Sequence, residues 1–264
     1  MSSEKAKAAN LSLSQFIKAI ASMLGPIITT SLVVYFGDWK LIFPVYAILS
    51  VASSLWLYSV KVDETMTEKS SASLGTIIQL LKNRFILIMI MSVFMMVGFD
   101  VAMNSNIANY LQTRFDINLE TASLGISIYF AALMIGRLAG AVMLRKLDAK
   151  YFLVISTILT LLGLAGIIFV DDLFTVQILI FITGLGFANL FPIIFAITVE
   201  SRPEYANEIS GLIIFFVCGG AVIPPLMGLI SQHYGVSLSF GVLVLCILYV
   251  GFAAWYALKS RKTA

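Results

Sequence analysis

The chain of 264 residues is 60% hydrophobic and only 12% charged, with a net charge of +3 and a mean hydropathy of +0.99. A water-soluble domain of this length carries roughly twice that charged fraction, so the composition excludes a soluble globular protein. The two cysteines, Cys218 and Cys246, lie within apolar runs and indicate no disulfide framework.

Apolar runs long enough to cross ~30 Å of hydrocarbon as helices follow one another along the chain. Because these runs are continuous and do not alternate, they predict helices and not the strands of a transmembrane barrel. In chain order we expect eight membrane-spanning helices, at residues 11–36, 41–60, 85–111, 122–144, 151–170, 174–199, 209–231 and 236–258. The predicted fold class is therefore an all-α transmembrane helical bundle.

One polar segment, residues 61–84, interrupts the apolar runs and contains a Ser-rich stretch. Within it, residues 74–81 predict a short helix at the membrane interface. We expect this segment to be a cytoplasmic linker between two bundles. Residues 1–60 would then form the last two helices of an N-terminal bundle, and residues 85–264 a C-terminal six-helix bundle.

The lysines and arginines of the loops are distributed unequally between the two sides of the membrane. If the N-terminus lies inside, thirteen of them face the cytoplasm and only Lys40 and Arg114 face the other side. This bias predicts an inner (plasma) membrane protein with both termini in the cytoplasm.

Residues 11–60 and 209–258 follow a similar pattern at a fixed offset of 198 positions. The matched pairs are Ser12 with Ser210, Pro26 with Pro224, Gly37 with Gly235, Tyr58 with Tyr256 and Lys61 with Lys259. Internal repeats in a membrane protein are typical of transporters built from duplicated bundles. The alternative is two unrelated hairpins that each contain a proline. If the halves are equivalent, the first bundle lacks its first four helices.

Four short motifs stand out in the C-terminal part of the chain: GRLAG at 136–140, LRKL at 144–147, FPIIF at 191–195 and GGAVIPPLMG at 219–228. Together they resemble the fucose/glucose/galactose:proton symporter family of the major facilitator superfamily. The first two resemble the fourth helix and basic loop of that family's C-terminal half, and the last two resemble its YPTIF and GGGIVTPVMG patterns.

This resemblance covers nearly all of residues 11–258 and implies a major-facilitator-type bundle with an incomplete N-terminal half, containing helices five to twelve. It also implies alternating access between the two halves. In the family, carboxylates on the first and fourth helices couple protons to sugar, and neither helix is among the eight expected here.

Two ionisable residues lie inside apolar runs, where an ionised group costs ~3 kcal/mol or more unless it is paired or faces water. The first is Lys18, which shares a helical face with Gln15. In the symporters the corresponding helix presents Gln and Asn at this spacing, so Gln15 matches and Lys18 departs. Lys18 could bind an anionic sugar derivative, pair with a carboxylate, or extend to the cytoplasmic surface.

The second is Asp100, which shares a helical face with Asn104 four residues later. Amides donate and accept hydrogen bonds at once, which suits sugar hydroxyls. Asp100 could be a proton site, a substrate ligand or the partner of Lys18, or it could form a structural hydrogen bond between helices. Asn189 could line the same pocket or serve in packing.

Other residues suggest gating or structural roles. Arg137 lies near the cytoplasmic end of its expected helix and could pair with Glu200 or Glu208, unless those acids are solvated loop residues. Proline kinks helices, so Pro26, Pro224 and Pro225 are candidates for the breaks that a rocking bundle needs.

The function that these features favour is secondary active transport, by family sugar:proton symport. The expected partners are a sugar or related metabolite, protons and the lipid bilayer, with no nucleic acid, and a monomer is expected. One histidine and two separated cysteines do not make a usual zinc site, and no other metal, cofactor or enzyme motif is present, so a membrane enzyme is disfavoured. The alternative is a truncated, non-transporting membrane protein that binds or regulates a partner.

Overall fold

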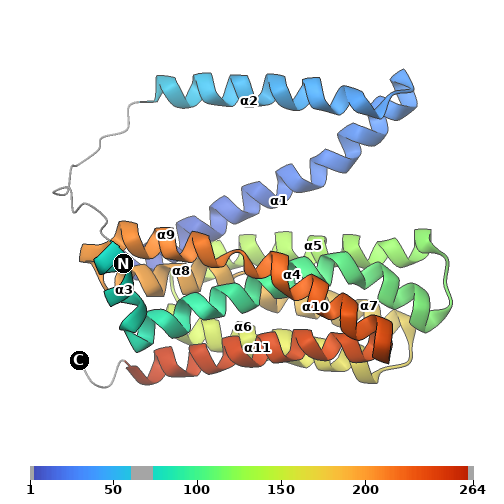
Figure 1. Cartoon of the computed structure of the whole chain (residues 1–264). Helices are drawn as coiled ribbons and strands as arrows, with labels where there is room; N and C mark the ends of the chain where they lie inside the picture. The colour runs from blue at the N-terminus through green and yellow to red at the C-terminus, as the bar shows by residue number, and fades with distance from the viewer. Residues whose placement is uncertain (1–2, 61–73, 261–264) are drawn as a thin grey trace. The chain divides into compact units, whose positions relative to one another are not determined.

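The computed structural model describes residues 3–60 and 74–260, and every regular element in these two ranges is a helix. Contacts divide the chain into two compact units, one formed by Met1–Ile17 with Ser73–Ala264 and the other by Lys18–Ala72. The helix α1 (Ser3–Phe36) begins in the first unit and ends in the second (Figure 1). The predicted all-α class is confirmed.

The second unit is a helical hairpin. It contains the end of α1, the 3-10 turn η1 (Trp39–Leu41) and α2 (Ile42–Ser59). Gly37 has a φ of 73°, which allows the chain to leave α1 in the left-handed region. Ile42 is the buried residue of α2, whereas Trp56 is 75% exposed. The apolar surface of α2 therefore faces outward within its own unit, as a lipid-facing or helix-facing surface does.

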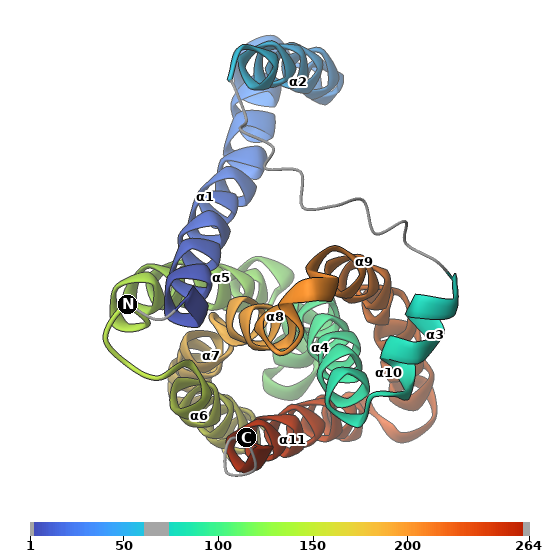
Figure 2. The same ribbon diagram turned by 90° about the vertical axis from the view of Figure 1, so that its left-hand side faces the viewer.

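The first unit is a bundle of long helices around α4 (Arg84–Phe115), as the end-on view in Figure 2 shows. The other helices are α3 (Leu74–Lys82), α5 (Leu119–Met143), α6 (Ala149–Phe169), α7 (Leu173–Phe187), α8 (Leu190–Glu200), α9 (Ala206–Phe216), α10 (Gly219–Tyr234) and α11 (Val236–Lys259). The short turn η2 (Pro203–Tyr205) joins α8 to α9. Helix α4 packs against α5, α8, α9, α10 and α11, which places it at the centre of the core.

Seven segments of the described residues are long and apolar enough to cross a membrane, so this is a multi-pass membrane protein. They are Ile42–Ser59, Arg84–Phe115, Thr121–Met143, Ala149–Phe169, Leu173–Glu200, Pro203–Tyr234 and Val236–Lys259. These agree within a few residues with seven of the eight expected spans. The remaining one, 11–36, falls in α1, where several side chains lie outside the described residues. The short helix expected at 74–81 is present as α3.

Four of the spans begin at an Asn or Asp that caps the helix. The side chains of Asn83, Asn118, Asp148 and Asp172 accept hydrogen bonds from the first free backbone N–H groups of α4, α5, α6 and α7. These groups have no partner inside the helix, so the caps fix where each span starts.

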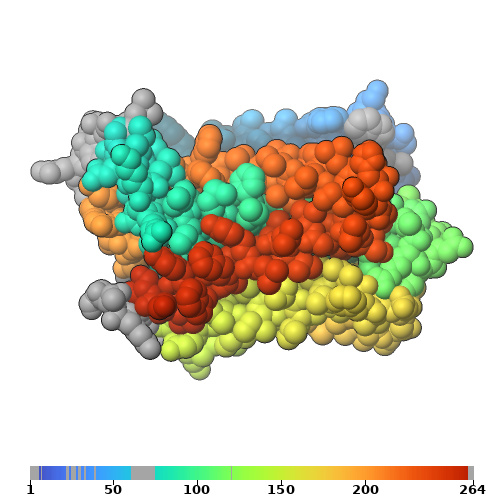
Figure 3. Space-filling view, turned by 60° about the horizontal axis from the view of Figure 1, so that its bottom comes forward, coloured from blue at the N-terminus to red at the C-terminus, as the bar shows by residue number. Residues whose placement is uncertain are grey.

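The core and the surface of the bundle are both apolar. Inside, the Phe99 and Phe187 rings stack at 4.9 Å, and the Tyr110 and Phe240 rings lie 4.2 Å apart. On the outside, large apolar side chains such as Leu162 on α6 and Leu245 on α11 are 63% and 67% exposed. Figure 3 shows α6 in yellow and α11 in red on the surface of the bundle. A surface of this kind is stable against lipid tails and not against water.

Two spans are broken rather than continuous. The Leu173–Glu200 span is interrupted between α7 and α8 at Asn189, shortly before Pro192. The Pro203–Tyr234 span is interrupted between α9 and α10 at Val217 and Cys218, ahead of Pro224 and Pro225. Proline lacks the N–H that would continue the helical hydrogen bonds, which favours a break in the turns before it.

Candidate functional site

A polar cluster lies between α4 and α5, inside two membrane spans. The Tyr129 hydroxyl donates a hydrogen bond to the Asp100 carboxylate at 3.1 Å, and the Asn104 amide donates to the same oxygen at 3.4 Å. Tyr129 is fully buried, while Asp100 and Asn104 are half-buried. The predicted shared face of Asp100 and Asn104 is therefore present, and Tyr129 joins it from the facing helix.

Arg137 extends this cluster along α5, two turns after Tyr129. Its side chain is partly buried, and it interacts electrostatically with Asp100 and Tyr129. One of its terminal nitrogens donates to the backbone carbonyl of Gln15 on α1 at 3.3 Å. Arg137 thus joins the start of α1 to the acidic group of the cluster. Its pairing with Glu200 or Glu208 stays a prediction.

Asn189 holds the start of α8 against α5. It is 2% exposed, and its amide donates to the Gly136 carbonyl at 2.7 Å. A Cβ atom at Gly140 would overlap the Asn189 amide, so glycine at this position allows the two helices to approach closely. Gly136 and Gly140 of the GRLAG motif thus form the surface that Asn189 contacts. Gly136 directly precedes Arg137 in the chain.

Four buried side-chain atoms among the described residues have no hydrogen-bond partner there. They are Ser12 Oγ, Asn104 Oδ1, Arg137 Nε and Asn189 Oδ1. Buried polar atoms are almost always satisfied in proteins, so these four atoms have hydrogen-bonding capacity that a water or a ligand can fill. Three of the four belong to the residues just described, and Ser12 lies one turn from Gln15 on α1. The cluster can therefore accept additional hydrogen-bonding groups.

A model of the Major Facilitator Superfamily matches residues 88–264. The chain belongs to the Major Facilitator Superfamily. It is 25% identical over 279 residues to a Helicobacter pylori protein named "Putative glucose/galactose transporter", covering 97% of this chain and 67% of that protein. It is 27% identical over 141 residues to the L-fucose-proton symporter of Haemophilus influenzae, covering 50% of this chain and 33% of that protein.

The fold of this facilitator-superfamily chain is that of a solved transporter. The E. coli fucose:proton symporter FucP superposes with a TM-score of 0.82 at 15% identity, covering 97% of this chain and 70% of that one. The chain thus spans about two thirds of the length of the curated relative and of the solved structure. The resemblance expected from the motifs is confirmed, and these relatives are transporters rather than enzymes.

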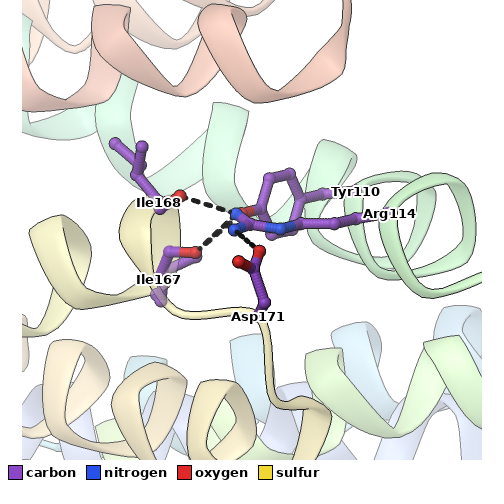
Figure 4. A network of polar contacts seen from close by, with 5 residues as sticks. All are labelled: Tyr110, Arg114, Ile167, Ile168 and Asp171. Atoms are coloured by element: carbon purple, nitrogen blue, oxygen red, sulfur yellow. Dashed lines mark hydrogen bonds and ion pairs between the residues drawn. The ribbon is translucent and has the colours of Figure 1, made fainter.

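A second polar network lies at the C-terminal end of α6 and was not predicted from the sequence (Figure 4). Arg114 Nη1 donates to the carbonyls of Ile167 at 3.0 Å and Ile168 at 2.8 Å, and it also contacts the Tyr110 hydroxyl. The Tyr110 hydroxyl donates to Ile167 at 2.6 Å, and Arg114 Nη2 pairs with Asp171 at 2.7 Å. Arg114 therefore caps the C-terminal carbonyls of α6, where a cation is favoured by the helix dipole.

This network explains why a cation occurs at the end of the bundle that the charge pattern assigns to the outside. Arg114 pairs with Asp171 and is held by backbone carbonyls, so its contacts with the end of α6 account for a cation at this position. The only sequence feature that could have predicted this network is a Tyr–Arg pair at i and i+4, followed later by an Asp after an apolar run.

The remaining predicted residues fall in different places. Gln15 belongs to the first unit and contributes its backbone carbonyl, whereas Lys18 belongs to the second unit and its side chain is exposed. Pro26 lies within α1, with its side chain outside the described residues. One expectation is wrong: Glu208 is not a solvated loop residue but is 8% exposed in the first turn of α9, because α9 packs against α4 and α8.

Proposed function

We propose that this chain works within a secondary active transporter that moves a sugar or a related polar metabolite together with protons, by alternating access. The observation that carries the proposal is the Asp100–Tyr129–Asn104–Arg137 cluster inside two membrane spans. An ionisable group within the bilayer is expensive to maintain, and it usually marks a substrate or ion pathway. The names of the relatives, for glucose/galactose and L-fucose-proton transport, point in the same direction.

Within this proposal, Asp100 is the group that takes up and releases the proton. Tyr129 and Asn104 donate hydrogen bonds to its carboxylate, and Arg137 interacts with it electrostatically. Protonation of Asp100 weakens these interactions and frees the donors for substrate hydroxyls. Gln15, Lys18 and Asn189 remain proposed contributors, Asn189 chiefly by positioning α8.

Arg137 is proposed as the link between this site and helix movement. Its bond to the Gln15 carbonyl ties α1 to α5, and its field reaches Asp100. A change in the charge of Asp100 therefore changes the strength with which Arg137 is held between the two helices. The breaks before Pro192 and before Pro224 and Pro225 supply points at which the spans bend.

The proposed topology has both termini on the cytoplasmic side of the plasma membrane, with residues 61–84 as the cytoplasmic linker between residues 1–60 and residues 85–264. The placement of Lys82, Arg145 and Lys259 at one end of the bundle supports it. In a variant with Cys218 and Cys246 replaced by serine, single cysteines in place of Lys146 and Asn118 should react with impermeant maleimide from the cytoplasmic and the external side, respectively. Labelling of both from the same side would contradict the topology.

The transport proposal is tested by uptake of labelled glucose, galactose and fucose into proteoliposomes with an imposed pH gradient. Two proteins are compared: the chain itself, and the chain extended at its N-terminus with the corresponding helices of the Helicobacter pylori relative. Proton-driven uptake by either protein supports the proposal. Absence of uptake by a correctly inserted extended protein, across this sugar series and a series of sugar acids, would refute it.

A second candidate function is binding of another membrane protein without transport. The observation that favours it is the apolar surface of α2, where Trp56 and Leu55 are 75% and 66% exposed. Cross-linking from Trp56→Cys in native membranes separates the two candidates. A stable partner of the chain, together with an absence of uptake by the extended protein, would favour this second function.

A further inference from the structure

A polar cavity at the end of the bundle lies apart from the proposed transport site. It has a volume of about 280 Å³ and lies between α3 and the connection from α8 to α9. Its lining is Thr76, Gln79, Leu80, Lys82, Asn83, Arg202 and Tyr205. Two of these residues are cationic, four are polar, and none is acidic, so the cavity is suited to an anion.

The walls of the cavity are held in place by the fold. On one side, Leu80 is buried, and Ile77 and Leu81 pack against the core, which fixes α3 on the bundle. At the end of α3, the Asn83 side chain caps α4 with hydrogen bonds of 3.0 and 3.2 Å. The opposite wall is the η2 turn, which carries Tyr205. The cavity is therefore part of the folded unit.

The chemistry of the lining suits a phosphate group. Lys82 offers an ammonium group and Arg202 a planar guanidinium, which binds phosphate oxygens in a bidentate manner. Thr76, Gln79 and Tyr205 add hydroxyl and amide donors. Arg202 also contacts Glu204 at 3.4 Å, but both side chains are about half exposed. An ion pair of that kind contributes little in water, so it does not prevent phosphate from binding.

The position of the cavity indicates which kind of molecule carries the phosphate group. Helix α3 is amphipathic and lies at the end of the bundle where the spans begin at Arg84 and end at Glu200, as Figure 3 shows for α3 in teal. The same end carries other cations outside the cavity, including Arg145, Lys150 and Lys259. Basic pockets at the ends of membrane helices attract the head groups of anionic lipids.

We propose that this cavity, lined by Lys82 and Arg202, binds the phosphate of an anionic phospholipid head group. The bound lipid holds α3 against the bundle at the membrane surface. This site is independent of the sugar and proton site, because its lining shares no residue with the Asp100 cluster.

Native mass spectrometry of the full chain, titrated with phosphatidylglycerol or phosphatidylcholine, tests the proposal. Phosphatidylglycerol should be retained in preference to phosphatidylcholine. The double substitution Lys82→Gln with Arg202→Gln should weaken retention of phosphatidylglycerol by about thirtyfold, and Lys82→Gln alone by about fivefold. The reason is that each cation near a membrane surface adds to the binding free energy of an anionic lipid. Gln79→Leu, which leaves both charges, should also weaken it.

The matched control replaces two cations at the same end of the bundle but outside the cavity, by Arg145→Gln with Lys150→Gln. This variant should keep the preference for phosphatidylglycerol. Equal loss in the two double variants, or equal retention of the two lipids by the native chain, would overturn the proposal. If the Lys82 and Arg202 double variant does not fold, the single Lys82→Gln variant decides. Displacement by inorganic phosphate with no lipid preference would overturn the lipid assignment in favour of a soluble anion.

Discussion

Tyr129 on α5 donates a hydrogen bond to Asp100 on α4 at 3.1 Å, across the interface between two membrane spans. Tyr129 is fully buried, so this hydroxyl has no access to water as an alternative partner. A hydrogen bond to a charged acceptor in such surroundings is stronger than one between neutral groups. The hydrogen bond between Tyr129 and Asp100 therefore holds α4 and α5 together.

The contribution of this bond to stability is measured with Tyr129→Phe. Loss of the hydroxyl should lower the free energy of unfolding by about 1.5–3 kcal/mol, because the Asp100 carboxylate loses a buried donor. Thermal unfolding in detergent gives the value. Tyr151→Phe is the matched control, since Tyr151 is 63% exposed on α6 and should change stability by less than about 0.5 kcal/mol. Equal effects of the two substitutions would show that the bond contributes nothing.

The role of Asp100 in transport is measured with Asp100→Asn in a transport-competent protein. The substitution keeps the size and the hydrogen-bonding capacity of the side chain but removes its titration. Proton-driven uptake should fall and lose its pH dependence, while membrane insertion stays unchanged. Asp116→Asn, at an exposed helix end where asparagine also tolerates a φ of 50°, should leave uptake intact. Unaltered kinetics and pH dependence in Asp100→Asn would remove this residue from the site.

Substitutions in the network at the end of α6 distinguish the contribution of helix capping to stability from that of the ion pair. Arg114→Gln should destabilise the protein by about 2 kcal/mol, because the Ile167 and Ile168 carbonyls lose charged donors. Asp171→Asn should cost less than about 1 kcal/mol, because the Asp171 side chain is 91% exposed and the ion pair is screened by water and salt. Thermal unfolding of both variants at low and high salt measures the two contributions. The reverse order would show that the ion pair, and not the cap, holds Arg114.

The sequence predicted those parts of the fold that depend on local pattern. The repeat paired Gly37 with Gly235, and both have positive φ, at 73° and 88°, directly after the helix ends at Phe36 and Tyr234. The spans followed from hydropathy, and the face shared by Asp100 and Asn104 followed from helical spacing.

Contacts between helices distant in sequence could not be predicted in the same way. Periodicity shows which residues share a helical face, but it does not show which helix that face meets. Tyr129 is 29 residues from Asp100, and Arg114 is 57 residues from Asp171, so both partners depended on the packing of the bundle. Glu208 was misplaced for the same reason, since its burial depends on the neighbours of α9.

The cap of α7 predicts a pH dependence outside the membrane spans. The Thr175 hydroxyl, and after it the Thr175 backbone N–H, donate to Asp172 and lower the pKa of this carboxyl. Because the pKa is lower in the folded state, the cap stabilises α7 above the unfolded-state pKa, and this effect is lost as the pH falls through the folded-state pKa. The protection of backbone amides against hydrogen exchange at the start of α7, relative to the intrinsic exchange rate at each pH, should therefore fall in acid.

Thr175→Val tests the cause of this shift, since it removes the hydroxyl and keeps the backbone N–H. The pKa of Asp172, followed by carbon NMR of its carboxyl group, should move up toward the ordinary aspartate value. Thr121→Val is the control, because Thr121 lies at the same helical position after the uncharged cap Asn118 and should leave Asp172 unchanged. A pKa that does not move in Thr175→Val would exclude the hydroxyl as its cause.

The glycines of α10 predict opposite responses to the same substitution. A Cβ atom at Gly219 would overlap the backbone carbonyl of Phe94 on α4, and a backbone atom cannot rotate away as a side chain does. Gly219→Ala should therefore force α10 away from α4 and destabilise the protein by about 1–3 kcal/mol. On the same helix, a Cβ atom at Gly228 would meet no other atom within 4 Å. Gly228→Ala should therefore leave stability unchanged or raise it by up to about 1 kcal/mol. Thermal unfolding of the two variants is the measurement, and a tolerated Gly219→Ala would mean that α4 and α10 do not approach each other this closely.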